Sequence, residues 1–215
     1  MEEGQLVWSH NYGFADEGAR QRTTSETIYP IASITKMVTG IMLLQLRERG
    51  KLHLADPVER YVPEVKKIPN PFPWTPPVTL IQLATMTAGL EANQPSTGEM
   101  PGVLRTDSWE KQLLGALPYL KYDYEPGTRR EYSNIGYCIL GLALSRAANR
   151  PFTEYVQSEI LIPIGMQNTT FTVTPEIEHR VARGYFLGEP NSPSARGSEL
   201  GPGPSASGGR SAFDT

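Results

Sequence analysis

The sequence predicts a mixed fold, α/β in the broad sense (α+β), in which helices outnumber strands. About five stretches carry apolar residues at helical spacing, and only two or three short stretches alternate like strands. The 215-residue chain also has no heptad run, no internal repeat and no regular strand–helix alternation. These observations favour a helical region with a minor sheet over a coiled coil or a parallel sheet.

The first elements are a strand and a long helix. Alternating residues predict a strand over 4–16 that runs into a turn at Gly13. From Ser33 the apolar positions follow helical spacing, and Gly50 closes this helix after a basic last turn. The sequence therefore predicts one long amphipathic helix that begins at a serine.

The next segment alternates loops with a short helix. Residues 54–65 predict a loop with a short helical turn at most, and five prolines make 68–78 irregular or extended. Thr79 and Gln82 have the spacing of a capping box, which predicts a helix start, and Gly89 is expected to end that helix.

Three further helices and one weak strand follow. A short amphipathic helix is expected over 108–117, capped by Asp107 or Ser108, and a longer, largely buried one over 134–150. The next helix, over 153–166, should stop at Pro163. The alternation in 169–174 is compatible with a strand.

The tail has a different composition. Fifteen of the 27 residues in 189–215 are Gly, Pro or Ser, which is typical of a loop and not of a packed element. We therefore expect a single domain over 1–215 whose last part, 189–215, is loop-like.

Composition excludes several functional classes. The net charge is −3 and no basic stripe occurs, which argues against a nucleic-acid partner. His10, His53, His179 and the single cysteine, Cys138, lie far apart, so neither a metal site nor an internal disulfide is expected.

The sequence leaves localisation open. No run of about 18 apolar residues occurs, so no membrane span is predicted. The first residues, "MEEGQLVW", lack the apolar core of a signal peptide. The chain as written therefore carries no recognisable export signal, although this alone does not place it in a compartment.

Ser33 and Lys36 are candidate catalytic residues. Three residues apart on a helix, their side chains share one face, so Lys36 can reach Ser33 Oγ. A serine needs such a neighbouring base to become a nucleophile, and the positive end of a helix favours the neutral amine that a base requires. The Ser33 N–H, free at a helix start, could also serve an oxyanion. The alternative is that Ser33 is only an N-cap.

A second candidate group lies in "EPGTRREYSNIGYCILG", residues 125–141. Tyr132 could relay a proton, and the Asn134 amide could bind a substrate carbonyl or hold Lys36. The alternative is structural: Ser133 or Asn134 caps the following helix, and Tyr132 packs against it. The residues alone leave both interpretations open.

Taken together, these motifs resemble the class C β-lactamase-like serine hydrolases. This family includes class C β-lactamases, D-alanyl-D-alanine carboxypeptidases, penicillin-binding-protein relatives and esterases. The resemblance covers about residues 5–215, in the family's order. It is carried by four stretches: "IASITKMVTGIMLLQLRERGKLHLADPVERYVPE", "VTLIQLATMTAGL", "EPGTRREYSNIGYCILG" and "PFTEYVQSEILIPIGMQNTTF".

The resemblance implies a β-lactamase/transpeptidase-like fold, with a helical lobe and an antiparallel sheet, and a role for each candidate. Ser33 would form an acyl-enzyme, Lys36 and Tyr132 would share acid and base work, and Asn134 would contact the substrate amide. No metal or cofactor is implied. The substrate would be a small ester, a peptide or a β-lactam, with an esterase or peptidase favoured over a dedicated β-lactamase.

The sequence departs from the family in three places. The third family motif, Lys-Thr-Gly or His-x-Gly on a strand beside the active site, does not occur in this chain. Both ends are short against the family pattern, so much of the sheet is expected to be missing. In "ATMTAGL", Met86 and Ala88 replace the usual His and Ser, a change expected to affect only a turn.

These departures lead to a competing hypothesis. Without the sheet, the helical lobe would expose an apolar face, which predicts self-association or another partner. The alternative function is therefore a non-catalytic fragment or interaction module that needs another chain segment to complete the active site.

Overall fold

The structure is a computed structural model that describes residues 7–92 and 108–184. The strands are β1 (Phe14–Asp16) and β2 (Gln21–Arg22). The α-helices are α1 (Thr35–Glu48), α2 (Leu80–Ala84), α3 (Trp109–Ala116), α4 (Asn134–Ala148), α5 (Phe152–Val156) and α6 (Pro175–Glu178). Short 3-10 helices are η1 (Ala32–Ile34), η2 (Val58–Arg60), η3 (Pro63–Lys67) and η5 (Leu117–Tyr119), and η6 (Gln157–Leu161) is a π-helix.

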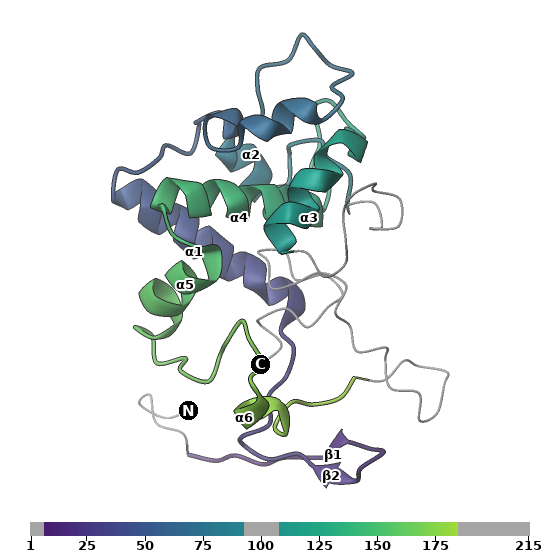
Figure 1. The fold of residues 1–215 in the computed structure, drawn as a ribbon, viewed down its shortest axis with the longest axis vertical. Coiled ribbons are helices and arrows are strands. Elements are labelled where there is room, and N and C mark those ends of the chain that lie inside the picture. The colour runs from purple at the N-terminus through teal and green to yellow at the C-terminus, as the bar shows by residue number, and fades with distance from the viewer. Residues whose placement is uncertain (1–6, 93–107, 185–215) are drawn as a thin grey trace.

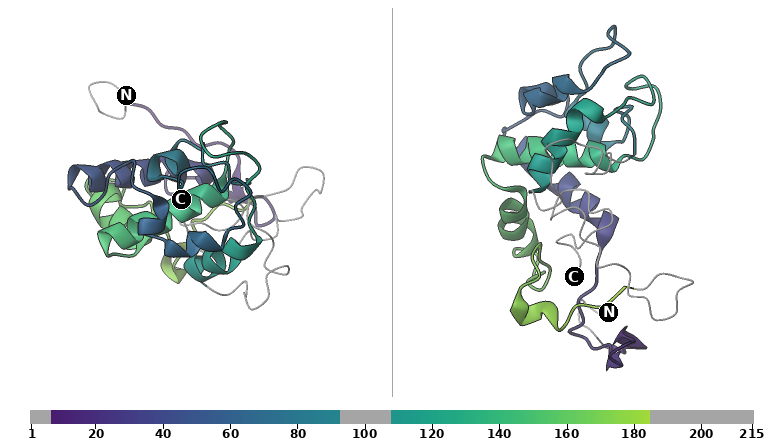
Figure 2. Two further views of the ribbon diagram at one scale, coloured as in Figure 1. Left: turned by 90° about the horizontal axis from the view of Figure 1, so that it is seen from above. Right: turned by 45° about the vertical axis from the view of Figure 1, so that its right-hand side comes forward.

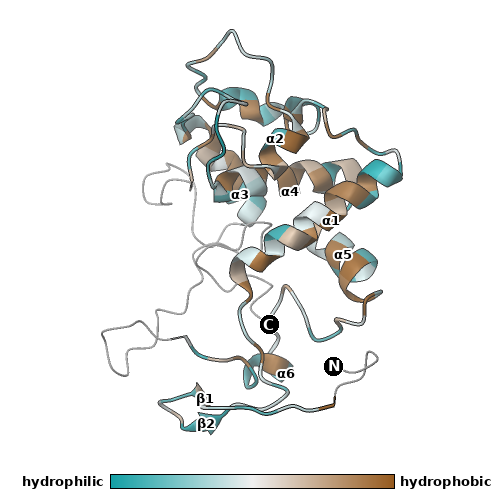
Figure 3. Cartoon of the chain, turned by 180° about the vertical axis from the view of Figure 1, so that it is seen from behind, coloured by the Kyte–Doolittle hydropathy of each residue, from teal (hydrophilic) through white to brown (hydrophobic). Residues whose placement is uncertain are grey.

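Helix α4 is the centre of a helical lobe. It packs against α1, α2, α3 and α5, and most of its residues are buried. Figure 1 shows these helices together at one end of the molecule, while β1, β2 and α6 lie at the other end. The right-hand view of Figure 2 shows the same separation of the two ends, and apolar segments run along α1 and α4 (Figure 3). The core is thus helical, as the spacing of apolar residues predicts.

The strands form a small antiparallel pair at the far end. Strand β1 pairs with β2, so the described residues contain a two-stranded sheet beside the helical lobe. Ile28 forms a parallel bridge with Val181, and the Arg183 N–H donates to the Ala15 carbonyl at 2.7 Å. These bonds hold the segment before Ser33 against the segment after α6. The predicted class, helices with a reduced antiparallel sheet, is confirmed.

The strand predicted over 4–16 is largely wrong. Of its described part, only Phe14–Asp16 is a strand, and residues 7–12 have no regular structure. Val7, Trp8 and Tyr12 are exposed, so the apolar side chains of this alternating segment do not pack against the core. A strand needs a neighbouring strand to pair with, and among the described residues no strand or bridge pairs with 7–12.

The strand suggested for 169–174 is also absent. Phe171 is buried and meets the Phe152 ring edge-on at 5.8 Å between centroids, which explains the apolar position. The Thr172 N–H donates to Thr170 Oγ1 at 3.1 Å, and this hydroxyl lies 3.2 Å from the Thr172 carbonyl. Such local side-chain bonds compete with ladder pairing, so the segment forms an anchored loop.

The helix starts follow the predicted caps. Thr79 and Gln82 form the predicted capping box at α2, and Ser108, one of the two predicted caps, accepts from the Lys111 N–H at α3. Residues 68–78 lack helix and strand, as the prolines predict. Gly50 follows the end of α1 at φ 67°, which agrees with its predicted role.

Gly89 does not end α2, contrary to the prediction. Helix α2 stops at Ala84, and Gly89 lies further along at φ 78°. A Cβ at Gly89 would lie 2.1 Å from the Tyr124 carbonyl oxygen. The glycine is therefore required because the loop at Tyr124 comes so close, and not because a helix ends there.

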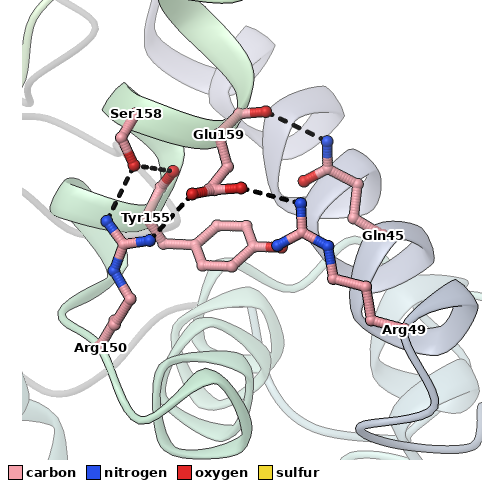
Figure 4. A network of polar contacts seen from close by, with 6 residues as sticks. All are labelled: Gln45, Arg49, Arg150, Tyr155, Ser158 and Glu159. Carbon is pink, nitrogen blue, oxygen red and sulfur yellow. Dashed lines mark hydrogen bonds and ion pairs between the residues drawn. The ribbon is translucent and has the colours of Figure 1, made fainter.

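The helix predicted over 153–166 changes type along its length. It begins as α5, continues as the π-helix η6 and ends at Leu161, with Ile162 as the C-cap directly before Pro163. Its Glu159 carboxylate accepts from Arg49 at 2.8 Å and from Arg150 at 3.0 Å (Figure 4). These bonds connect the C-terminal end of α1 to η6. Ser33 lies at the other end of α1.

Candidate active site

The turn that carries Ser33 has an unusual backbone. Ser33 is the middle residue of η1, which leads directly into α1. Ala32, just before it, has φ 41°, in the left-handed region that a residue with a Cβ rarely adopts. The Thr35 hydroxyl is buried and donates to the Ala32 carbonyl at 2.6 Å, which holds this turn. Backbone strain of this kind is concentrated at functional sites.

The Ser33 side chain points toward two other functional groups. Its Oγ lies 2.7 Å from the Tyr132 hydroxyl, and Lys36 Nζ donates to it at 3.3 Å. Neither η1 nor α1 has a side-chain cap, so the N-cap interpretation of Ser33 does not hold. Ser33 is exposed and can therefore be reached by a ligand.

Lys36 lies at the centre of this group. It is only 8% exposed, and its Nζ donates to Asn134 Oδ1 at 2.7 Å in addition to Ser33 Oγ. The same nitrogen lies 4.8 Å from the centroid of the Tyr132 ring. Asn134 thus holds the lysine, as one of the two sequence interpretations proposed.

The loop before α4 presents Tyr132 and Asn134 on either side of a capping serine. Ser133 Oγ accepts from the Gly136 N–H at 2.9 Å and donates to the Glu91 carbonyl at 2.6 Å. Ser133 therefore provides the cap that the structural alternative expected. Tyr132, which that alternative placed in packing, is instead 43% exposed with its hydroxyl on Ser33.

Electrostatics favour ionisation of Tyr132. Partial burial is the largest single influence and raises the pKa of its phenol, but hydrogen bonding to Lys36 and Ser33 and the Lys36 charge together outweigh it. The net effect holds the pKa of Tyr132 below its usual value. A tyrosine with a lowered pKa, in contact with a serine hydroxyl, has the properties of a general base.

The structure brings together all four predicted site residues, Ser33, Lys36, Tyr132 and Asn134, from η1, α1 and the start of α4. Sequence reasoning missed Thr35 and Ala32. A buried threonine beside the candidate nucleophile gives no distinctive signal, and alanine does not indicate a positive φ. At Met86, one of the two positions that depart from the family pattern, the carbonyl accepts from the Glu131 N–H at 2.9 Å.

Other site types find no support in the part of the chain that the structure describes. There, no group of three or more His, Cys, Asp or Glu side chains is arranged to hold a metal ion. None of its helices has the length and apolar character needed to cross a membrane. The single cysteine, Cys138, is half-buried in α4. The 189–215 tail lies outside the described residues.

Comparison with known proteins identifies a matching family and several relatives of this chain. The family model described as Beta-lactamase matches residues 1–212. The D-alanyl-D-alanine-carboxypeptidase/endopeptidase AmpH of Escherichia coli K12 is 33% identical over 166 residues, which cover 77% of this chain and 42% of that protein. Protein flp of Staphylococcus aureus MW2 is 30% identical over 187 residues, or 87% of this chain and 36% of that protein.

Solved structures that resemble this chain include proteins of the same types. A β-lactamase/D-alanine carboxypeptidase from Yersinia pestis, complexed with citrate, superposes with a TM-score of 0.68 at 30% identity and covers 92% of this chain and 53% of its own. A class C β-lactamase superposes with a TM-score of 0.73 at 25% identity, covering 93% and 51%. The chain thus spans about half the length of these proteins or less. Since the family model matches nearly all of it, the chain belongs to the Beta-lactamase family of serine hydrolases.

Proposed function

We propose that this protein is a serine hydrolase that forms an acyl-enzyme on the carbonyl of an ester, an amide or a β-lactam. The observation that carries the proposal is the position of Ser33 Oγ, 2.7 Å from the Tyr132 hydroxyl and 3.3 Å from Lys36 Nζ. A serine hydroxyl becomes a useful nucleophile only with a base at this distance. Its exposure leaves room for a carbonyl carbon to approach.

The proposed acylation uses Tyr132 as the base. Ser33 Oγ bonds to the carbonyl carbon while its proton passes to the Tyr132 oxygen, whose lowered pKa favours the phenolate. The carbonyl π electrons move to the oxygen, for which the Ser33 N–H supplies one donor. The tetrahedral intermediate then collapses, the leaving group takes the proton from Tyr132, and the acyl group stays on Ser33.

Deacylation repeats these steps with water as the nucleophile. Tyr132 takes the proton from water and returns it to Ser33 Oγ as the acid product leaves. Lys36 hydrogen-bonds to the Ser33 and Tyr132 side chains and offsets the negative charge that develops on Tyr132. Asn134 fixes the lysine through its 2.7 Å bond and has an amide nitrogen that can donate to a substrate carbonyl.

The proposed substrate is a small molecule with an acyl group, such as an ester, a D-alanyl peptide or a β-lactam. The relatives' names support this class, since they include a D-alanyl-D-alanine carboxypeptidase/endopeptidase and a class C β-lactamase. We favour an ester or peptide over a β-lactam as the main substrate. No metal or cofactor is required by the proposed steps.

Active-site labelling tests the proposal. We expect a fluorophosphonate probe to label the purified chain and a chromogenic cephalosporin to acylate it, with the adduct located on Ser33 by peptide mass spectrometry. Ser33→Ala should abolish labelling, whereas Ser9→Ala, which alters an exposed serine outside the site, should not. A folded sample that no acylating probe labels would overturn the proposal.

A second candidate function rests on an exposed apolar stripe that runs from the end of η1 along α1. Ile34, Met37, Ile41 and Leu44 follow helical spacing and are between 40% and 68% exposed. We propose that this stripe takes part in self-association, the alternative in which the chain acts as an interaction module. Analytical ultracentrifugation should then show oligomers that Met37→Glu dissociates, and a monomeric wild-type chain at all concentrations would contradict it.

A further inference from the structure

Lys36 lies between two tyrosine rings, and the proposed chemistry uses only one of them. Its Nζ is 4.8 Å from the centroid of the Tyr132 ring and 5.5 Å from the centroid of the Tyr137 ring. An ammonium group within about 6 Å of an aromatic face is attracted by the ring quadrupole. Because Lys36 is only 8% exposed, water weakens this attraction little.

Tyr137 is itself firmly held. It lies in α4, five residues after Tyr132, and is only 8% exposed. Its hydroxyl donates to the Ala84 carbonyl at the end of α2, at 2.8 Å. The hydroxyl is thus bonded to α2, and the ring is the part of Tyr137 that lies near the ammonium. Helices α2 and α4 together fix the position of this ring.

We propose that Tyr137 is a positioning residue, whose ring holds the Lys36 ammonium beside Ser33 and Tyr132 by a cation–π contact. The inference rests on the proposed hydrolase function. Asn134 restrains Lys36 through one hydrogen bond, and the Tyr137 ring restrains it from α4. The two restraints leave the nitrogen within reach of both the nucleophile and its base.

The two tyrosines have opposite electrostatic tendencies. Burial is the largest influence that raises the pKa of Tyr137, the charge on Tyr132 adds to it, and Arg130 opposes it. The pKa of Tyr132 is instead lowered, because Lys36 and Ser33 outweigh its partial burial. Two titratable groups whose pKa values are shifted in opposite directions take different roles. Tyr137 stays neutral, and Tyr132 is the one that exchanges protons.

Charged groups act on the two tyrosines from two elements, and the tyrosines also act on each other. Lys36 in α1 lies near both rings, and Arg130, from the loop before Tyr132, acts on Tyr137. If the Tyr137 ring is removed, Lys36 is less well held and stabilises the Tyr132 phenolate less. The pKa of Tyr132 then rises toward its usual value. The pH at which acylation reaches half its maximum must therefore move up.

The experiment compares Tyr137→Phe with Tyr137→Leu in the full chain. Phe keeps the ring and loses only the bond to Ala84, so its labelling rate and pH profile should stay much closer to wild type than those of the Leu variant. Leu should slow fluorophosphonate labelling about tenfold, a free-energy difference of about 1.4 kcal/mol, and shift the half-maximum to higher pH. Circular dichroism and thermal melts establish that each variant is folded.

A fluorinated series separates the cation–π contact from packing. Phenylalanine analogues with one, two or three ring fluorines at position 137 keep the shape but weaken the ring quadrupole. The labelling rate should fall stepwise with each fluorine. If the analogues and Tyr137→Leu label like Tyr137→Phe, with the same pH profile, the inference is wrong although the hydrolase proposal stands. If the wild-type chain itself is not labelled, the hydrolase proposal is the one that fails.

Discussion

The Ser33 and Tyr132 oxygens lie 2.7 Å apart, although 99 residues separate the two side chains in the sequence. The contact joins the turn before α1 to the loop before α4. It therefore exists only when these two helices are packed together, as the core arrangement dictates. The proposed nucleophile and base thus depend on the same helix packing that stabilises the fold.

Replacement of the Tyr132 hydroxyl is the first prediction. Tyr132→Phe keeps the ring over Lys36 but removes the oxygen that would receive the Ser33 proton. Loss of a general base typically costs about 10²–10⁴ in rate, so stopped-flow labelling should slow by that factor. The rate of wild-type labelling should increase as pH rises through the lowered pKa of Tyr132. The variant should lack this increase in its pH–rate profile. Equal rates for both proteins would rule out Tyr132 as the base.

The turn at Thr35 gives a second prediction. Thr35→Val removes the buried hydroxyl that donates to the Ala32 carbonyl at 2.6 Å, at a cost of about 1 kcal/mol in the free energy of unfolding. This bond holds Ala32, the strained residue before Ser33. The rise in the activation free energy of labelling should therefore exceed the loss in the free energy of unfolding. Thr35→Ser keeps the hydroxyl and is the matched control. A Val variant that labels as fast as the Ser variant would show that the bond does not position Ser33.

Two glycines at positive φ provide a third, paired prediction. Gly89 and Gly50 have φ values of 78° and 67°, but only at Gly89 would a Cβ meet a neighbour, the Tyr124 carbonyl oxygen at 2.1 Å. Gly50→Ala should cost about 1–2 kcal/mol, from the backbone alone. Gly89→Ala adds a clash with the backbone and should cost roughly 2–5 kcal/mol. Urea unfolding measures both, and equal losses would disprove the close approach.

Local patterns allowed much of the helical lobe to be predicted. Helical spacing, the capping box at Thr79 and the proline-rich segment 68–78 depend on neighbours in sequence, and the structure agrees with each. The proximity of Ser33 and Lys36 follows from the helical repeat alone. Tyr132 and Asn134 could be placed beside them only because the motifs occur in the order of a known family.

What could not be predicted depends on contacts between distant segments. The strand expected over 4–16 lacks a partner along most of its described length, and a sequence pattern does not reveal whether a partner exists. Gly89 looks like a helix end, but its role is set by the loop at Tyr124. Tyr137 reads as one more apolar position in α4, and only the packing of α1 on α4 brings its ring to Lys36.

Acid and alkaline stability depend on the contact between Asp56 and Tyr61. The Tyr61 hydroxyl donates to the Asp56 carboxylate at 2.6 Å, and the His53 N–H donates to it at 2.8 Å. The Tyr61 bond, followed by the His53 bond, lowers the pKa of Asp56 despite its burial. Burial and the same bond raise the pKa of Tyr61 to about 12.

The signs of these shifts define the fourth prediction. A lowered carboxyl pKa stabilises the fold above the unfolded value of about 3.9, and this stability is lost as pH falls through the folded value. A raised tyrosine pKa stabilises below about 10 and is lost as pH rises toward 12. Asp56→Asn should therefore flatten the acid side of the stability–pH curve, measured by thermal melts from pH 2 to 7. It should also bring the ultraviolet titration of Tyr61 to lower pH, with Tyr61→Phe as the control that identifies its signal. An Asn variant with the wild-type acid profile would show that Asp56 contributes nothing to it.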